Sequence, residues 1–268
     1  MIRLLLFGPL ALVVLCAVAC SLLFAIQRAL LYHPSPAPAA GHTQVLDAGG
    51  TELRVEVWEQ AGDEAVIYFG GNAEDVSRTA DQMVNAFPGR AIFALHYPGY
   101  GGSPGAPSEA SIVSAARRLF DWVRQHHAAV LLVGRSLGSG VAVQVASQRP
   151  VQALVLVTPF YSLAEVAQAQ YRLFPVHWML VDRYDSWRHA PRVGVPVLLV
   201  AAAQDTLVPV ASTARLAAAF APGLARIVTL SGVDHNSISV DPRYASILGL
   251  VLPSGRAAPV PKPTAHRP

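Results

Sequence analysis

The sequence predicts an α/β protein whose mostly parallel sheet has helices on both faces. Short runs rich in β-branched residues alternate with stretches of helical periodicity from about residue 65 to residue 230, and this alternation is typical of a parallel sheet. The chain has 268 residues, of which 53% are hydrophobic. That length is sufficient for one large domain with an ample core.

An uncharged apolar segment precedes the domain. It runs from Leu4 to Ile26, and a helix of this length spans roughly 35 Å, which exceeds the hydrocarbon core of a bilayer. We expect residues 1–31 to form a transmembrane anchor. The run Ala17-Val18-Ala19 also fits a signal-peptidase site, so a cleaved secretory signal is the alternative.

The positions of charged residues and cysteines indicate on which side of the membrane the domain lies and which bonds and partners it lacks. Arg3 precedes the apolar segment and Arg28 follows it, and with the terminal amine they give a small bias toward an N-terminus on the inside. We therefore expect an extracytoplasmic domain. Cys16 and Cys20 both lie in the apolar segment, which excludes a disulfide or a thiolate metal site in the domain. The net charge is +3 without a basic run, so nucleic acid is not an expected partner.

Proline-rich segments flank the predicted domain, which covers residues 44–252. Residues 32–43 carry three prolines and predict a linker, and residues 253–268 carry five and predict a disordered tail. Residues 43–58 predict an antiparallel hairpin that turns at 47–50. Further strands are predicted at residues 65–69, 91–97, 129–133, 151–157, 195–201 and 226–230.

A long amphipathic helix is predicted at residues 108–127. Ser108 suits its N-cap. Its apolar positions recur at the spacing of one helix face and comprise Ile112, Ala116, Leu119, Phe120 and Val123. This pattern predicts a helix that packs on one side of the sheet.

A serine lies between the predicted strand 129–133 and a following helical stretch. Residues 134–138 read Gly-Arg-Ser-Leu-Gly, which is the G-x-S-x-G pattern of a nucleophile elbow. The small flanking residues allow a sharp turn that holds the Ser136 hydroxyl outward. We interpret Ser136 as a nucleophile, and a structural helix cap is the alternative.

A serine nucleophile requires a base, and the base requires an acid that orients it. His235 follows the predicted strand 226–230 and Asp205 follows the strand 195–201. Because the carboxyl ends of parallel strands meet at one edge of a sheet, we expect both to lie near Ser136. Other acids near candidate loops are alternatives to Asp205, namely Asp182, Asp185 and Asp234.

The oxyanion of an acyl-transfer reaction requires two backbone N–H donors. Leu137 directly follows the serine and supplies one of them. The loop after the strand 65–69 contains two glycines that allow close backbone approach, and we assign the second donor to Asn72. This chemistry requires neither a metal nor an organic cofactor. His126 and His127 face apart on a helix, which argues against a metal site.

Further motifs accompany these residues in a fixed order. They are Gln27-Arg28 to Pro34, Gly70-Gly71-Asn72, Pro98 to Ser103, the elbow at Ser136, Asp205 to Pro209, and Asp234-His235-Asn236. With them the sequence resembles the α/β-hydrolase superfamily, and within it the small membrane-anchored serine hydrolases related to depalmitoylating thioesterases. The resemblance covers roughly residues 27–250. It implies an eight-stranded, mostly parallel sheet, a small cap inserted at about residues 161–194, and a Ser136-Asp205-His235 triad.

The sequence departs from this family at two positions. Gly70 replaces the usual histidine of the oxyanion loop, and Pro98 replaces an arginine in the following loop. The first change affects the set of oxyanion donors, and neither change removes the triad. The aromatic residues of the cap either line an acyl groove or pack on the sheet; they are Tyr171, Phe174, Trp178, Tyr184 and Trp187.

The predicted activity is cleavage of a carboxylic ester or thioester through an acyl-enzyme on Ser136. Because the anchor holds the site near lipid-borne substrates, a lipid ester or an acyl-protein thioester is favoured. A soluble ester or a peptide is the alternative substrate. The alternative to an enzyme is a membrane-tethered binding or scaffold protein, since a fold does not fix function.

Overall fold

The computed structural model describes residues 2–38, 42–58 and 62–252. They form one eight-stranded sheet with the order β1-β2-β4-β3-β5-β6-β7-β8. The strands are β1 (Thr43–Asp47), β2 (Glu52–Trp58), β3 (Glu64–Phe69), β4 (Ala91–Leu95), β5 (Ala129–Arg135), β6 (Leu154–Val157), β7 (Val197–Ala202) and β8 (Ala225–Leu230). Only the pairs β1–β2 and β2–β4 are antiparallel among these described strands. The predicted fold class and the eight-stranded sheet are confirmed.

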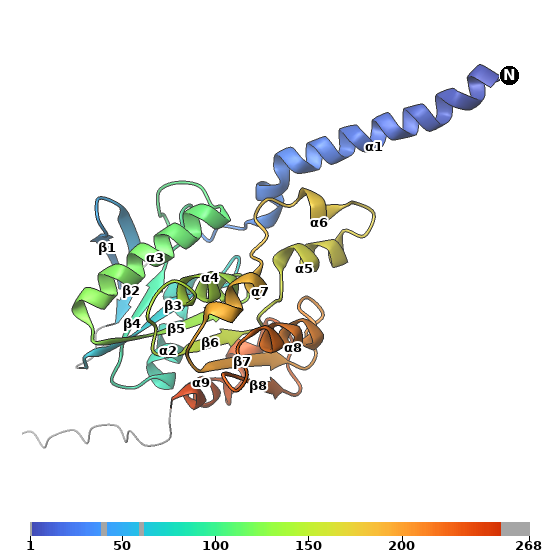
Figure 1. Cartoon of the computed structure of the whole chain (residues 1–268). Coiled ribbons are helices and arrows are strands. Elements are labelled where there is room, and N and C mark those ends of the chain that lie inside the picture. The colour runs from blue at the N-terminus through green and yellow to red at the C-terminus, as the bar shows by residue number, and fades with distance from the viewer. Residues whose placement is uncertain (1, 39–41, 59–61, 253–268) are drawn as a thin grey trace, which may run out of the picture.

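Helices cover both faces of the sheet (Figure 1). They are α2 (Ala80–Ala86), α3 (Glu109–His126), α4 (Leu137–Ala146), α5 (Leu163–Gln170), α6 (Val176–Met179), α7 (Ser186–His189), α8 (Val210–Ala219) and α9 (Tyr244–Leu248). One core lies between the sheet and α3, α4 and α8, and the other lies under α2 and α9. Successive residues of β5 alternate between the two cores, Leu132 in the first and Leu131 and Val133 in the second. The central strands are therefore apolar on both faces, as a covered parallel sheet requires.

The amphipathic helix predicted at residues 108–127 is α3. Its predicted apolar face is buried. The Ser108 hydroxyl accepts a hydrogen bond from the Ser111 N–H at 3.0 Å, and the Ser111 hydroxyl accepts one from the Ser108 N–H at 2.9 Å. These reciprocal bonds form a capping box that fixes where the helix begins.

Three predicted strands are shorter in the structure than the sequence predicts. The strand predicted at 195–201 begins at Val197 and ends at Ala202. The strand predicted at 91–97 ends at Leu95, and the strand predicted at 151–157 begins at Leu154. The apolar residues outside the ladder at 96–97 and 151–153 are nevertheless buried, namely Tyr97, Val151 and Ala153. Their apolar character therefore reflects burial in the core rather than strand pairing.

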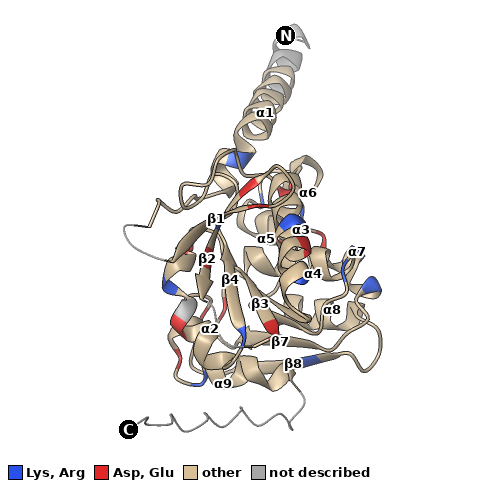
Figure 2. Cartoon of the chain, turned by 90° about the vertical axis from the view of Figure 1, so that its left-hand side faces the viewer, with Lys and Arg blue, Asp and Glu red and all other residues tan. Residues whose placement is uncertain are grey.

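The apolar N-terminal segment forms α1 (Ile2–Leu31), which extends away from the domain (Figure 1). Residues Leu10–Leu31 have a mean hydropathy of 2.6, so by length and composition this helix can cross a membrane. Within Leu10–Leu31 the charged residue is Arg28, at the end beside the domain (Figure 2). The tail predicted at residues 253–268 lies outside the described residues.

The segment after α1 packs on the domain. Residues 32–38 adopt neither helix nor strand, but Tyr32 and Ser35 are buried. The Tyr32 and Tyr184 hydroxyls lie 3.1 Å apart. The part of the predicted linker that the structure describes therefore contributes to the domain surface.

Candidate active site

Ser136 lies at a strained turn between β5 and α4. Its φ is 49°, a value that residues with a side chain rarely adopt. The turn is tight because a Cβ at Gly134 would lie 2.3 Å from the Gly138 carbonyl oxygen, and one at Gly138 would lie 2.0 Å from that of Phe69. Both glycines of the motif are therefore required for close backbone approach. The turn leaves Ser136 half-buried at the carboxyl edge of the sheet.

The structure brings Ser136, His235 and Asp205 together. His235 Nε2 lies 2.9 Å from Ser136 Oγ, and His235 Nδ1 lies 2.8 Å from Asp205 Oδ2. The second carboxylate oxygen of Asp205 accepts hydrogen bonds from the backbone N–H groups of Leu207 at 2.9 Å and Val208 at 2.7 Å. The side chain of Asp205 is only 1% exposed. The carboxylate is thus fixed behind the imidazole and shielded from water.

The alternative acids are engaged elsewhere. Asp182 forms an ion pair with Arg28 at 2.8 Å, and Asp185 accepts a hydrogen bond from the Ser162 hydroxyl at 2.7 Å. Asp234 is exposed and accepts hydrogen bonds from its own loop. The Ser237 backbone N–H is the main cause that holds the pKa of the Asp234 carboxyl below its usual range. Among these four acids, Asp205 is therefore the one that contacts His235.

The loop after β3 lies beside the serine. A Cβ at Gly71 would lie 3.7 Å from the Cβ of Ser136. The Gly71 N–H donates to Glu74 Oε2 at 2.6 Å, so it is not free to bind an oxyanion. Leu137 is the first residue of α4, where the N–H has no acceptor within the helix. The donor roles of the Leu137 and Asn72 N–H groups stay predictions. Leu137 directly follows Ser136 at the start of α4, and Asn72 follows Gly71 in the loop after β3.

The side chain of Asn72 is held by three hydrogen bonds. Its Oδ1 accepts from the Tyr100 hydroxyl at 2.7 Å and from the His33 N–H at 3.0 Å, and its Nδ2 donates to the Leu31 carbonyl oxygen at 2.6 Å. Burial raises the pKa of Tyr100 to about 12, so its hydroxyl stays a proton donor at neutral pH. These bonds attach the loop to the end of α1.

Gly70, which replaces the histidine of the family pattern, lies where there is little room for a side chain. A Cβ at Gly70 would lie 2.6 Å from the Cγ1 of Val76. A histidine at this position would therefore require Val76 to move. The Gly70 carbonyl oxygen instead accepts a hydrogen bond from the Tyr97 hydroxyl at 2.8 Å.

The sequence analysis missed Glu74, whose carboxylate lies under the serine loop. One oxygen accepts hydrogen bonds from the hydroxyls of Tyr68 at 2.7 Å and Thr79 at 2.8 Å. The other accepts from Gly71 and from the Arg135 guanidinium at 2.9 Å. Burial, reinforced by the Glu74 charge, raises the pKa of the Tyr68 phenol, which keeps it protonated as a donor.

Arg135 connects this carboxylate to the histidine loop. Its second amino group donates to the carbonyl oxygen of His235 at 3.3 Å. Burial by itself lowers the pKa of the guanidinium, but the Glu74 carboxylate more than offsets this and the pKa is raised. A charged residue at the end of an apolar strand was the available signal in the sequence, because a buried charge requires a partner.

Comparison with known proteins decides the family. A family model described as the alpha/beta hydrolase fold matches residues 64–186. An uncharacterized protein of Mycobacterium tuberculosis is 37% identical over 227 residues, which cover 78% of this chain and 80% of that protein. The chain belongs to the α/β-hydrolase superfamily.

Two further proteins resemble this hydrolase. The lysophosphatidylserine lipase ABHD12 of Danio rerio is 29% identical over 204 residues, which cover 67% of this chain and 52% of that lipase. This hydrolase thus spans about half of the lipase's length. The solved structure of the monoacylglycerol lipase of Paleococcus ferrophilus shares the fold, with 21% identity, a TM-score of 0.57, and coverage of 75% of this chain and 98% of that one. The fold and the lipase relatives support a hydrolytic function.

The cap of the hydrolase lies between β6 and β7 and includes α5 and α6. Its aromatic residues lie in three different surroundings, and lining of an acyl groove stays a prediction. Tyr184 is fully buried in the core, and Trp187 stacks on Tyr161 with 5.8 Å between ring centroids. Tyr171 and Phe174 instead line an apolar hollow against α1, and Trp178 is 88% exposed.

Within residues 2–38, 42–58 and 62–252, no three His, Cys, Asp or Glu side chains lie close enough together to hold a metal ion. His126 stacks on Trp122 with 4.2 Å between ring centroids. His127 packs edge-on against Phe93, so the two histidines do lie in different surroundings.

Replacement of Gly138 by alanine is expected to destabilise the domain, because the new Cβ would overlap the Phe69 carbonyl oxygen. Overpacking of this kind costs about 3 kcal/mol, and denaturant unfolding in detergent measures the loss. Gly194→Ala is the matched control, since a Cβ at Gly194 meets no atom within 4 Å. A Gly138→Ala variant as stable as wild type would contradict the close contact.

Replacement of Glu74 by alanine is expected to lower the free energy of unfolding by about 3 kcal/mol, because it leaves the Arg135 guanidinium buried without its partner. The two side chains are 11% and 13% exposed. The exposed pair of Glu165 and Arg215 provides the control. Glu165→Ala should change stability by no more than about 0.5 kcal/mol, and equal losses in the two variants would argue against a special role for Glu74.

Proposed function

We propose that this chain is a membrane-anchored serine hydrolase that cleaves carboxylic ester or thioester bonds. The observation that carries the proposal is the hydrogen-bonded series Ser136, His235 and Asp205, with heavy-atom distances of 2.9 and 2.8 Å. A base within this distance of a hydroxyl can take its proton during attack. The buried carboxylate favours the imidazolium that results.

The reaction proceeds in two halves. His235 Nε2 takes the Ser136 proton while Oγ attacks the substrate carbonyl carbon, and the N–H groups of Leu137 and Asn72 stabilise the oxyanion. The imidazolium then protonates the leaving alcohol or thiol, and the acyl group stays on Oγ. In the second half, His235 takes a proton from water while the water oxygen attacks the acyl carbon. The imidazolium then returns that proton to Ser136 Oγ as the bond between Oγ and the acyl carbon breaks, and the carboxylic acid leaves.

A lipid ester is the favoured substrate class. Two similar proteins are lipases by name, acting on lysophosphatidylserine and monoacylglycerol. The apolar helix α1 would hold the domain at a bilayer, where such esters reside. An acyl-protein thioester offers the same acyl group and the same carbonyl chemistry.

Replacement of Ser136 by alanine is expected to abolish labelling by a fluorophosphonate probe and to lower kcat for p-nitrophenyl esters by at least about 10⁴-fold. Ser147→Ala, which removes a hydroxyl from the other end of α4, is the matched control and should label like wild type. If wild type and Ser136→Ala label equally, the chain is a binding or scaffold protein rather than an enzyme of this kind.

The domain is expected to lie outside the cytoplasmic membrane, with the helix retained. Protease added to intact cells, or to cells stripped only of outer layers, should digest the domain without permeabilisation of the cytoplasmic membrane. The intact mass of the membrane-bound protein should include residues 1–19. Digestion only after permeabilisation would reverse the orientation, and a mass lacking the first 19 residues would identify a cleaved signal.

A further inference from the structure

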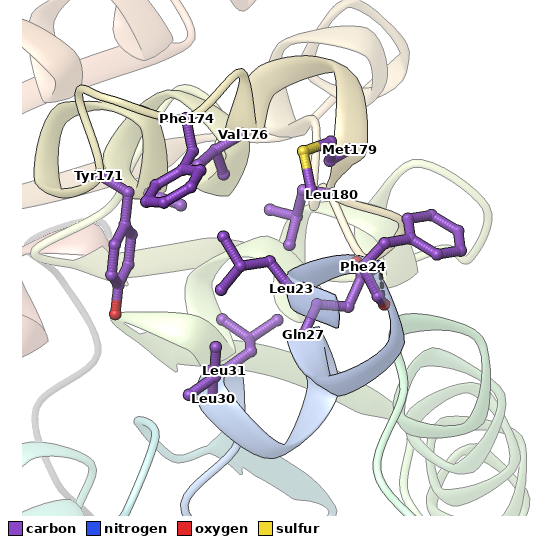
Figure 3. Close-up of a pocket in the computed structure, with 11 residues that line it drawn as sticks. Leu23, Phe24, Gln27, Leu30, Leu31, Tyr171, Phe174, Val176, Met179 and Leu180 are labelled. Atoms are coloured by element: carbon purple, nitrogen blue, oxygen red, sulfur yellow. Dashed lines mark hydrogen bonds between the residues drawn. The ribbon is translucent and has the colours of Figure 1, made fainter. Parts of the chain in front are cut away.

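An apolar hollow lies where α1 meets the cap (Figure 3). One wall is the last two turns of α1, and the other wall is α5, α6 and the residues between them. About 600 Å³ of space, part of it open to solvent, lies between the walls. The residues that line it are Leu23, Phe24, Gln27, Leu30, Leu31, Ala167, Tyr171, Phe174, Val176, Met179 and Leu180.

The lining offers almost no polar partner to an occupant. Gln27 is the only amide among the lining residues, and its polar atoms are already used. Its Nε2 donates to the Phe24 carbonyl oxygen at 2.8 Å, and its Oε1 accepts from the Val181 N–H at 2.7 Å. The Tyr171 hydroxyl is the other polar side-chain group of the lining, so a charged group buried here would find few hydrogen-bond partners. The occupant is therefore an uncharged hydrocarbon.

The hollow opens on the side where the membrane would lie. Phe24 is both a lining residue and 53% exposed. On the cap, Leu173 is 94% exposed and Trp178 is 88% exposed. Exposed side chains of this size beside a spanning helix are typical of residues that enter the bilayer interface. A hydrocarbon chain could therefore pass from the bilayer into the hollow without crossing water.

The inner end of the hollow adjoins the serine loop. Leu31 lines the hollow, and its carbonyl oxygen accepts the 2.6 Å hydrogen bond from the Asn72 side chain. Asn72 follows Gly71, at which a Cβ would lie 3.7 Å from that of Ser136. The loop that contains Gly71 and Asn72 therefore contacts both the last residue of α1 and the nucleophile.

The position of α1 relative to the cap is fixed by polar contacts. Arg28 forms a bidentate ion pair with the buried Asp182, in which Nε donates to Oδ2 at 2.8 Å and Nη2 donates to Oδ1 at 3.3 Å. Gln27 accepts the hydrogen bond from Val181, in the same short segment. These contacts hold α1 against the cap, so the distance between the two walls of the hollow is fixed.

We infer that this hollow binds the acyl chain of a bilayer lipid and guides its carbonyl to Ser136, so that the membrane helix forms one wall of the substrate site. The inference rests on the proposed function and names its substrate as a long-chain acyl ester. The helix then has a role in selecting the chain length as well as in anchoring.

The test compares palmitate and butyrate esters of p-nitrophenol with the full-length protein in lipid nanodiscs. Leu23→Trp and Ala167→Trp fill the hollow from opposite walls. Each should lower the palmitate-to-butyrate ratio of kcat/KM at least tenfold, and fluorophosphonate labelling of Ser136 shows that each variant is folded. Leu22→Trp, the same substitution on an adjacent exposed residue, is the matched control and should leave the ratio unchanged. An unchanged ratio in both filled variants would overturn the inference.

A second measurement does not depend on these variants. A fluorophosphonate that carries a long alkyl chain with a terminal diazirine is attached to Ser136 of the wild-type protein and then photolysed. Mass spectrometry should find cross-links in residues 23–31 or 163–180. Cross-links confined to other segments would overturn the acyl site while leaving the serine hydrolase intact. Failure of the probe to attach to Ser136 would instead overturn the proposed function.

Discussion

The carboxylate of Glu74 joins parts of the site that are far apart in the sequence. Each of its oxygens accepts two hydrogen bonds, and the donors include Gly71 in its own loop and the guanidinium of Arg135. Arg135 also reaches the His235 carbonyl oxygen. The loops after β3, β5 and β8 are thereby tied through one largely buried ion pair. Because buried charges are stable only with such partners, the geometry around Ser136 depends on this pair.

The end of the apolar helix is bound to the same network. Asn72 connects the carbonyl oxygen of Leu31 to the loop that contains Gly71, and the buried Tyr32 lies against Tyr184. Burial raises the pKa of Tyr32, so its hydroxyl remains protonated in this contact. The helix is therefore not joined to the domain by a free tether. Its position and that of the serine are parts of one structure.

Much of this architecture could be predicted from local patterns in the sequence. The alternation of strand and helix patterns predicted the parallel sheet, and the glycines around Ser136 indicated the tight turn. The order of Ser136, Asp205 and His235 along parallel strands predicted that they would meet, and the structure brings them together.

Other features depend on contacts that no local pattern encodes. The role of Glu74 requires Arg135, which lies 61 residues away. The hollow forms only where α1 contacts the cap. The ion pair of Arg28 and Asp182, which are 154 residues apart in the sequence, holds them together. The division of the cap aromatics likewise follows from which of them face α1. Periodicity shows which side chains are apolar, but it does not show which other segment will cover them.

The cap leaves the sheet after β6 and returns at β7, and these two strands are direct neighbours in the ladder. Their spacing is set by backbone hydrogen bonds and does not depend on how many residues connect them. Insertions or deletions in that excursion can therefore remodel the entrance while the reactive groups keep their places. Variation among relatives is expected to concentrate there, so hydrolases with the same catalytic residues can differ in the shape of the entrance to the site.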